Sequence, residues 1–237
     1  MMSGLSYAVI LLNWRRPGNL LPIIRGVLEA VPQAHIFLID QAERHNRLAG
    51  SADFPWDSIW YRSHENRGPG VRFELAAQLP YDRFLCIDDD VFLEARQITG
   101  LLDALDRDTS RPHGVAGQVG NTSEGKSYLS GPQTGSMQVS VLNWVYAFTP
   151  EQAVETINLA SLLGFYRYAG NADDILLSSA GELAPLIHDF GAVNLCPTCD
   201  DPEIAVWQRP GFFDERAELI SKLRRVGRFH ADAESNG

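Results

Sequence analysis

Three consecutive carboxylates are the residues of this sequence with the clearest potential for chemistry. Asp88, Asp89 and Asp90 follow directly on the apolar run 84–87, which predicts a buried strand. The carboxyl ends of strands are where open α/β sheets bind their ligands. Neighbouring carboxylates repel one another unless cations compensate them, and Mn²⁺ or Mg²⁺ would do so while leaving positions open for phosphates. The pattern favours a metal site over a solvated acidic turn. Strand alternation would place Asp88 and Asp90 on one side and Asp89 on the other.

A diphosphate held by such a metal also requires fixed positive charge, and three arginines are candidates for it. Arg15 follows the first predicted strand, Arg72 lies in a predicted helix before the acidic triplet, and Arg216 lies in the predicted C-terminal helix. Each of them alone is typical of an exposed surface arginine. Their shared positions at the ends and starts of elements that face one sheet edge favour a phosphate-binding set.

A second acidic cluster contains Asn171, Asp173 and Asp174 and opens an apolar, helical stretch. Asn171 or Asp173 could simply cap the helix, and carboxylates in a first turn suit the helix dipole. Capping explains one residue more readily than it explains three. The alternative is that a carboxylate at the helix start holds an acceptor hydroxyl or faces a developing oxocarbenium centre.

The elements that position these residues alternate between strand and helix. An apolar run at 7–12 predicts a buried strand, helical periodicity follows at 19–31, and a second strand at 36–39 ends at Asp40. Strand, helix and strand within about 30 residues form the βαβ unit of a parallel sheet. The elements that continue this pattern are a weaker strand at 59–62, a helix at 70–79, the strand at 83–87 and its resumption at 91–93.

The second half of the sequence has a different character. Residues 115–148 are rich in Gly, Ser, Gln and Asn with scattered β-formers, which predicts mixed or antiparallel strands and a long loop around 120–135. The helices predicted beyond it lie at about 150–163, from Asp173 onward and at about 212–226.

These elements predict one α/β domain with a doubly wound, mixed sheet. Its nucleotide-binding half would comprise residues 1–112, and its acceptor-binding half residues 113–229. The last residues, 230–237, are predicted to be a disordered tail.

Composition sets limits on partners and location. Of the 237 residues, 45% are hydrophobic and 21% are charged, which is ordinary for a globular domain with a buried core. The formal net charge of −10 argues against nucleic-acid binding, because phosphate backbones repel an acidic surface. No apolar run approaches the roughly 20 residues of a transmembrane helix, and the run at 7–12 lacks the basic segment of a signal peptide. We therefore expect no transmembrane segment and a cytoplasmic protein.

Cys196 and Cys199 form a C-x-x-C pair. Such a pair could be half of a zinc site or a redox dithiol. No second pair accompanies it, and no thioredoxin-like βαβ pattern leads into it, so the sequence assigns neither role.

Four segments, in their order and spacing, resemble the exostosin-like glycosyltransferases, the retaining family 64 of the GT-A superfamily. The segments are VILLNWR at 9–15, IDDD at 87–90, NADDI at 171–175 and WQRPGFFDER at 207–216. The resemblance extends over about residues 7–226 and implies a GT-A fold. Asp40 stands where the family tends to have asparagine, Ala172 stands where it has cysteine, and residues 115–140 show no match.

The resemblance also implies roles for the residues described above. Asp90 would coordinate Mn²⁺ or Mg²⁺, with Asp88 as a second candidate ligand, while Asp88 and Asp89 would contact the ribose and the sugar. Asp174 would be the catalytic-site carboxylate, with Arg216 reaching the diphosphate beside it. The full set of donor-binding candidates is Arg15, Asp40, Arg72, Asp88, Asp89, Asn171 and Asp173.

The predicted function is transfer of a sugar, an N-acetylhexosamine or a related hexose, from a UDP-sugar to a glycan or another hydroxyl acceptor, with retention of configuration. An inverting GT-A transferase with Asp173 or Asp174 as general base is the first alternative. A sugar-phosphate nucleotidylyltransferase is another, although residues 13–18 lack the glycine-rich loop and lysine of such enzymes. A non-catalytic sugar- or nucleotide-binding module is the third.

Overall fold

A computed structural model describes residues 4–42, 54–63, 65–123, 126–165 and 172–230. The central sheet has eight strands, in the order β10-β13-β6-β12-β4-β1-β2-β3. The four strands at one end are parallel: β4 (Arg83–Ile87), β1 (Tyr7–Asn13), β2 (His35–Asp40) and β3 (Ile59–Ser63). The predicted parallel arrangement of the first half is therefore confirmed.

The other half of the sheet is mixed. β12 (Val145–Phe148) is antiparallel to β4, and β6 (His113–Gly114) is antiparallel to β12. β13 (Leu186–Ile187) is parallel to β6, and β10 (Met137–Gln138) is antiparallel to β13. The prediction of mixed or antiparallel strands in the second half is confirmed.

Three two-stranded ribbons accompany the central sheet. They are β5 (Val91–Phe92) with β14 (Asn194–Leu195), β7 (Ala116–Gln118) with β11 (Val141–Asn143), and β8 (Gly120–Ser123) with β9 (Lys126–Leu129). The last pair is a hairpin, so the prediction of a long loop at 120–135 was wrong for residues 120–123 and 126–129, whereas residues 130–136 form neither a helix nor a named strand. Backbone hydrogen bonds hold a hairpin together, and a polar composition does not exclude them.

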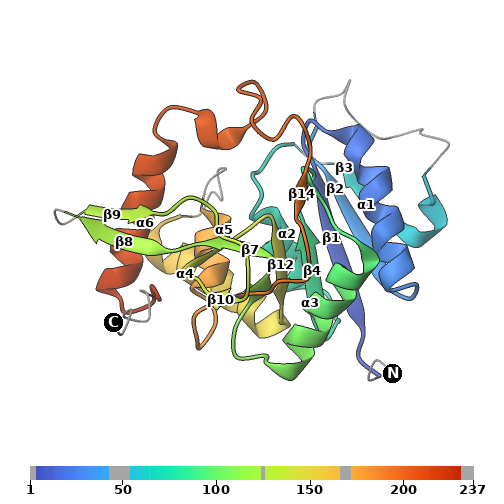
Figure 1. Cartoon of the computed structure of the whole chain (residues 1–237), viewed down its shortest axis with the longest axis horizontal. Helices are drawn as coiled ribbons and strands as arrows, with labels where there is room; N and C mark the ends of the chain where they lie inside the picture. The colour runs from blue at the N-terminus through green and yellow to red at the C-terminus, as the bar shows by residue number, and fades with distance from the viewer. Residues whose placement is uncertain (1–3, 43–53, 64, 124–125, 166–171, 231–237) are drawn as a thin grey trace.

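Helices cover both faces of the sheet (Figure 1). α1 (Pro17–Ala30) and α3 (Ala95–Arg107) pack on one face, whereas α2 (Val71–Ala76), α4 (Pro150–Leu163) and α5 (Asp173–Ser178) contribute to the core on the other. α6 (Phe212–Arg225) packs beside the β8–β9 hairpin, at the end of the molecule away from α1 (Figure 1).

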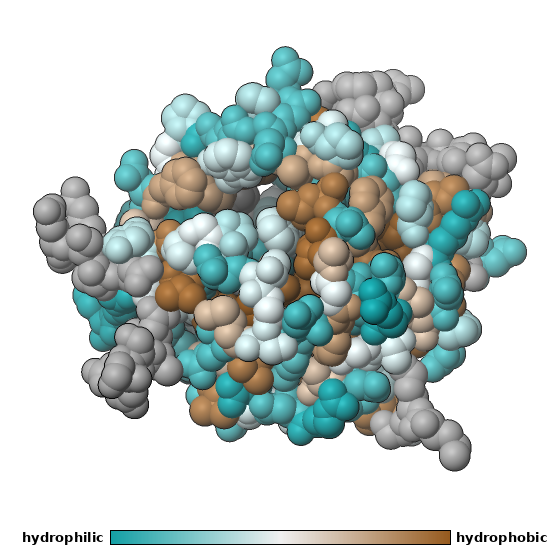
Figure 2. Space-filling view, viewed as in Figure 1, coloured by the Kyte–Doolittle hydropathy of each residue, from teal (hydrophilic) through white to brown (hydrophobic). Residues whose placement is uncertain are grey.

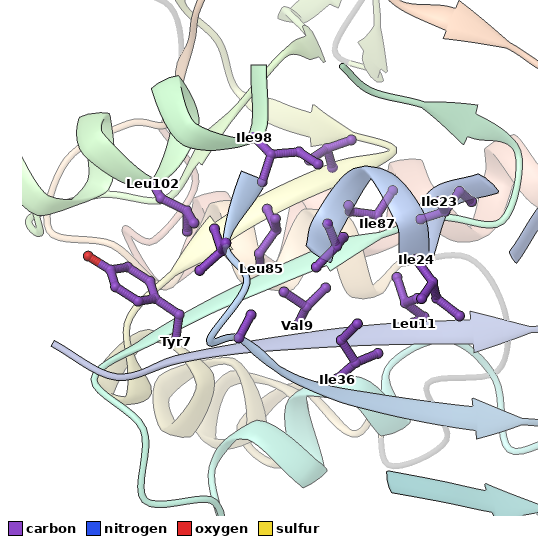
Figure 3. Packing of buried hydrophobic residues seen from close by; sticks show 14 of the residues in the cluster. Tyr7, Val9, Leu11, Ile23, Ile24, Ile36, Leu85, Ile87, Ile98 and Leu102 are labelled. Atoms are coloured by element: carbon purple, nitrogen blue, oxygen red, sulfur yellow. The ribbon is translucent and has the colours of Figure 1, made fainter. Parts of the chain in front are cut away.

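The core follows from the apolar runs of the parallel strands. Every residue of β1 is buried, and alternate side chains enter different layers. Val9 and Leu11 face α1 and α3, where Figure 3 shows them packed near Ile24, while Ile10 lies in the opposite layer. Full burial of one large apolar side chain contributes about 1.5–3 kcal/mol. Because these strands are covered on both faces, they appear in the sequence as continuous apolar runs.

Several predicted boundaries change in the structure. α1 begins at Pro17, two residues before the predicted start, because proline suits the first helical position. α2 is shorter than the helix predicted at 70–79. Of the predicted tail, His230 is described and its Nε2 lies 3.3 Å from the carbonyl oxygen of Gly181, while residues 231–237 lie outside the described residues.

Within the described part of the chain, no helix combines the length and the apolar character needed to cross a bilayer. The cellular location and the division into halves at residue 112 stay predictions.

Candidate active site

The acidic triplet forms a turn at the end of β4 rather than a continuation of the strand. The backbone N–H of Asp88 donates to the carbonyl oxygen of Trp144, at 2.9 Å, which ties the end of β4 to the residue before β12. After the turn, β5 pairs with β14 instead of rejoining the central sheet. The predicted alternation was therefore wrong, because it assumed extended backbone. Asp88 is directed to one arginine, and Asp89 and Asp90 are directed to another.

Arg16 is the arginine that meets Asp89 and Asp90. Its guanidinium lies 2.9 Å from Asp89 Oδ1 and 3.5 Å from Asp90 Oδ2, and its side chain is only 9% exposed. The backbone N–H of Trp14 and the side-chain amide of Asn19 donate to Asp89 as well. The β1–α1 loop therefore grips the acidic turn.

Arg15, the predicted donor-binding residue, contacts the segment between β14 and α6. Its guanidinium donates to the carbonyl oxygen of Glu203, at 2.6 Å, and lies over the ring of Trp14. Sequence reasoning missed Arg16, its direct neighbour. The available signal was Pro17, which starts α1 and thereby fixes the residue before it at the sheet edge.

Arg72 joins the two acidic clusters, a contact that the sequence did not predict; its predicted role in binding the donor stays a prediction. Its side chain is 3% exposed, and its guanidinium lies 2.5 Å from Asp88 Oδ1 and 2.8 Å from Asp173 Oδ2. The ring of Tyr146 lies beneath it, 4.8 Å from the guanidinium carbon. Burial opposes the charge, but Asp88 and Asp173 outweigh that effect and raise the pKa of Arg72. Arg72 and Asp173, which lie 101 positions apart in the sequence, are thus in direct contact.

Arg216 and Asp174 form a buried bidentate pair. Two guanidinium nitrogens donate to the two carboxylate oxygens, each at 2.8 Å, and Asp174 Oδ1 also accepts from the backbone N–H of Ile175. Arg216 also lies 3.4 Å from Gln118 Oε1 and faces the ring of Phe212. The sequence predicted Asp174 and Arg216 but not Gln118, because an isolated glutamine carries no pattern.

Asp40 lies apart from this cluster, in a network of its own. Its Oδ1 accepts from the side chain of Asn13 and the backbone N–H of Ala42, and its Oδ2 accepts from the hydroxyl of Tyr61. This fully buried carboxylate therefore holds the ends of β1 and β2 and the middle of β3 together. Its predicted donor contact stays a prediction. Asn171, another predicted donor contact, lies outside the described residues.

The site carries more negative than positive charge. Among the described residues, the two acidic clusters contribute five carboxylates, which form ion pairs in three sets with Arg16, Arg72 and Arg216. Together these groups carry a formal charge of −2 when all are ionised. Burial raises the pKa of Asp88 to about 7, although Arg72 opposes the shift. Burial and the neighbouring charge of Asp89 raise the pKa of Asp90 to about 6, and burial likewise raises the pKa of Asp174. The arginines therefore compensate these carboxylates incompletely.

Asp90 offers an oxygen for a cation. Its Oδ1 is buried, and no other residue in the described part of the chain donates to it. That part of the chain contains no cluster of three or more His, Cys, Asp or Glu side chains arranged to hold a metal. A divalent ion held by one or two carboxylates and by substrate phosphates needs no such cluster, so the residues present fit Mg²⁺ or Mn²⁺.

The C-x-x-C segment lies against the acidic turn. The backbone N–H of Cys196 donates to the carbonyl oxygen of Asp90, and Arg16 donates to the carbonyl oxygen of Thr198. Cys196 and Cys199 are free thiols. The chain from β14 to α6 then arches over the upper edge of the view in Figure 1, and Figure 2 shows the surface hollowed beneath that arch.

The comparisons with known proteins show the fold alone. No protein-family model and no curated protein matches the sequence. A crystal structure of S. aureus TarS 1–349 superposes with a TM-score of 0.53 at 14% identity, over 83% of this chain and 61% of that chain. A CMP:2-keto-3-deoxy-manno-octonic acid synthetase complexed with CTP gives a TM-score of 0.45 at 9% identity, over 65% of this chain and 78% of that one, and is too distant to support an argument.

The chain therefore has the predicted fold: one mixed α/β domain of the GT-A type. It spans less than two thirds of the TarS chain that it resembles. The resemblance to the exostosin-like family stays a prediction.

Proposed function

We propose that the chain is a metal-dependent glycosyltransferase that uses a UDP-sugar donor. One observation carries the proposal: within the described part of the chain, the five carboxylates of the two acidic clusters pair with three guanidinium groups, and no other residue donates to Asp90 Oδ1. A divalent cation would balance the excess charge of −2. The GT-A-type fold supports the assignment, because open α/β sheets bind nucleotides at this edge.

Asp90 would hold the metal, with Asp88 as the second candidate ligand. When bound, the ion would neutralise the diphosphate and stabilise it as a leaving group. Arg16 and Arg72 are the guanidinium groups nearest these acids, so we propose that they bind the diphosphate. Arg16 thereby takes the role that the sequence suggested for Arg15.

Asp174 would act on the transferred sugar rather than as a base. Arg216 donates to both of its oxygens, and its charge favours the ionised carboxylate and so opposes the uptake of a proton from an acceptor hydroxyl. A clamped carboxylate is instead suited to stabilise positive charge at the anomeric carbon. This geometry favours retention over the inverting alternative. The anomeric configuration of the product, measured by NMR, separates the two.

A thermal-shift experiment tests the donor and the metal together. UDP, UDP-N-acetylglucosamine and UDP-glucose are each added with Mn²⁺ or with a chelator. A ligand that binds only the folded state raises the melting temperature by mass action. We expect a rise only when nucleotide and Mn²⁺ are both present, and no rise in Asp90→Asn. An equal rise with chelator would refute the metal-dependent proposal.

A further inference from the structure

The junction between β11 and β12 lies between the two acidic clusters. The carbonyl oxygen of Trp144 accepts from Asp88, which opens the acidic turn. On the other side of the junction, the N–H of Leu142 donates to Ser178 Oγ, at 2.9 Å, in the helix that begins with Asp173. The residue between these two ties is Asn143, so its side chain belongs to a segment fixed to both halves of the site.

The orientation of the Asn143 amide follows from its neighbours. Gln118 Nε2 donates to the carbonyl oxygen of Ser130, at 2.6 Å, which directs Gln118 Oε1 toward Arg216. That oxygen can only accept, so the group of Asn143 that lies 3.3 Å from it must be the NH₂. The Asn143 carbonyl oxygen, Oδ1, therefore does not contribute to this network.

Asn143 Oδ1 is a buried acceptor to which no group of the described residues donates. Buried polar atoms in folded proteins are nearly always paired, so an exception requires an explanation such as a functional role or a bound water or ion. The hydrogen bond to Gln118 accounts for the NH₂ group of Asn143, but it leaves the Asn143 oxygen without a role. The next residue adds a second exception, because Trp144 is the one described non-glycine residue with a positive φ, at 64°. Such backbone conformations persist mainly at functional sites.

We propose that Asn143 Oδ1 accepts a hydrogen bond from a ring hydroxyl of the donor sugar, and that Asn143 thereby contributes to donor specificity. The inference rests on the proposed function and adds a specificity residue to it. A carbonyl oxygen can bind only a donor group, which excludes the diphosphate oxygens. Among the hydroxyl and N–H groups of the donor we choose the sugar hydroxyls, because the Asn143 segment is tied both to Asp88 and to the helix of Asp173 and Asp174. The oxygen is covered in the free protein, so the contact forms together with a rearrangement of the strained Asn143–Trp144 junction.

Calorimetric titrations of Asn143→Ala test the proposal. The affinities of UDP, UDP-N-acetylglucosamine and UDP-glucose are measured with Mn²⁺, for this variant and the wild type. Loss of one hydrogen bond from sugar to protein weakens binding by about 5- to 10-fold. We expect that loss for at least one UDP-sugar while UDP binds as before. Asn158→Ala, an exposed asparagine of α4, is the matched control and should change neither affinity.

Deoxy analogues of the affected UDP-sugar identify the hydroxyl and guard against a general effect of the substitution. The analogue that lacks the contacting hydroxyl should bind the wild type more weakly and should lose nothing further in Asn143→Ala, because contacting groups are non-additive. The proposal is wrong if Asn143→Ala weakens the binding of UDP as much as that of the UDP-sugars. It is also wrong if, for both UDP-sugars, the ratio of UDP-sugar affinity to UDP affinity is the same in the variant as in the wild type. Unchanged donor binding with impaired transfer would assign Asn143 to the acceptor and also contradict it. A wild type that binds no UDP would refute the proposed function itself.

Discussion

Asp89 and Asp90 share one guanidinium, and that sharing decides which arginine serves the site. Arg15 and Arg16 are adjacent and chemically identical, yet Arg16 contacts the acidic turn, whereas the guanidinium of Arg15 donates to the carbonyl oxygen of Glu203. The side chain of Arg16 is nearly buried and already fixed by Asp89, so little conformational entropy remains to be lost when a phosphate binds.

Substitution of each arginine in turn distinguishes them. We expect Arg16→Ala to weaken binding of UDP with Mn²⁺ by about 10-fold or more, corresponding to about 1.4 kcal/mol. Arg15→Ala should have a clearly smaller effect, because its guanidinium is directed to the Glu203 carbonyl. Calorimetric titration measures both affinities. The larger loss in Arg15→Ala would show that the resemblance, and not the contact geometry, identifies the phosphate-binding residue.

The buried ion pair between Arg216 and Asp174 predicts a large effect of a single substitution on the free energy of unfolding. Both side chains are less than a tenth exposed, so removal of one partner leaves a buried charge without compensation. We expect Arg216→Leu to lower the free energy of unfolding by about 3–5 kcal/mol. Urea denaturation measures the change.

The double variant Arg216→Leu with Asp174→Asn is the matched control, because it removes both charges and should recover part of the loss. Equal stability of the single and double variants would show that the pair is not coupled as its geometry indicates.

At the scale of elements, the residues of the site lie at the ends of strands and the starts of helices. β1 ends beside Asp40, β4 ends at the acidic turn, α1 begins just after Arg16, and α5 begins with Asp173 and Asp174. Element ends carry backbone groups that the regular structure does not satisfy, which makes them suitable places for polar side chains. The turn at Trp144 completes this arrangement, because its carbonyl oxygen takes the N–H of Asp88.

The positive φ of Trp144 predicts an effect on stability that does not depend on its indole ring. Trp144→Ala and Trp144→Gly both remove the indole, but only glycine adopts a φ of 64° without strain. We therefore expect the glycine variant to be more stable than the alanine variant by about 1 kcal/mol, which reverses the usual order of these residues. Thermal and urea unfolding give the difference. An alanine variant that is equally stable would show that this turn stores no strain.

His113 of β6 stacks on His188, the residue directly after β13, and this pair predicts a pH dependence. His113 Nδ1 lies 2.9 Å from His188 Nε2, and burial lowers the pKa of His188 to about 4 and lowers that of His113. The unfolded chain takes up these protons nearer pH 6.5, so this contribution to stability is complete above that pH and is lost as the pH falls toward 4. We expect melting temperatures at pH 7.5 and 5.5 to differ less in His188→Phe than in the wild type. An identical difference would contradict the assignment.

At the scale of the whole molecule, the sequence predicts the parallel half of the sheet better than the mixed half. β1, β2 and β4 are covered by helices on both faces, so burial leaves a continuous apolar run that can be read directly. β6, β10 and β13 have only two residues each, and backbone bonding to distant strands defines them. No local pattern carries that information, and the β8–β9 hairpin was missed for the same reason.

The site shows the same division. The acidic triplet, Arg72, Asp174 and Arg216 were recognisable because short motifs or their spacing marked them. The sequence did not indicate that Arg16, rather than Arg15, contacts the acidic turn, or that Asn143 contacts Gln118. Both contacts depend on the path of the backbone through a turn or a strand junction. Sequence periodicity assumes regular backbone, and the triplet 88–90 is irregular.

The central claim is that the end of β4 binds a divalent cation together with a nucleotide diphosphate. Anomalous diffraction from a crystal grown with UDP and MnCl₂ tests it most directly, because the signal of manganese locates the ion without assumptions about its ligands. We expect one strong manganese peak at bonding distance from a carboxylate oxygen of Asp90. The UDP phosphates should complete the coordination shell of the ion, and Arg16 or Arg72 should contact these phosphates. UDP bound elsewhere on the molecule, or bound at this edge with no manganese beside Asp90, would contradict the claim.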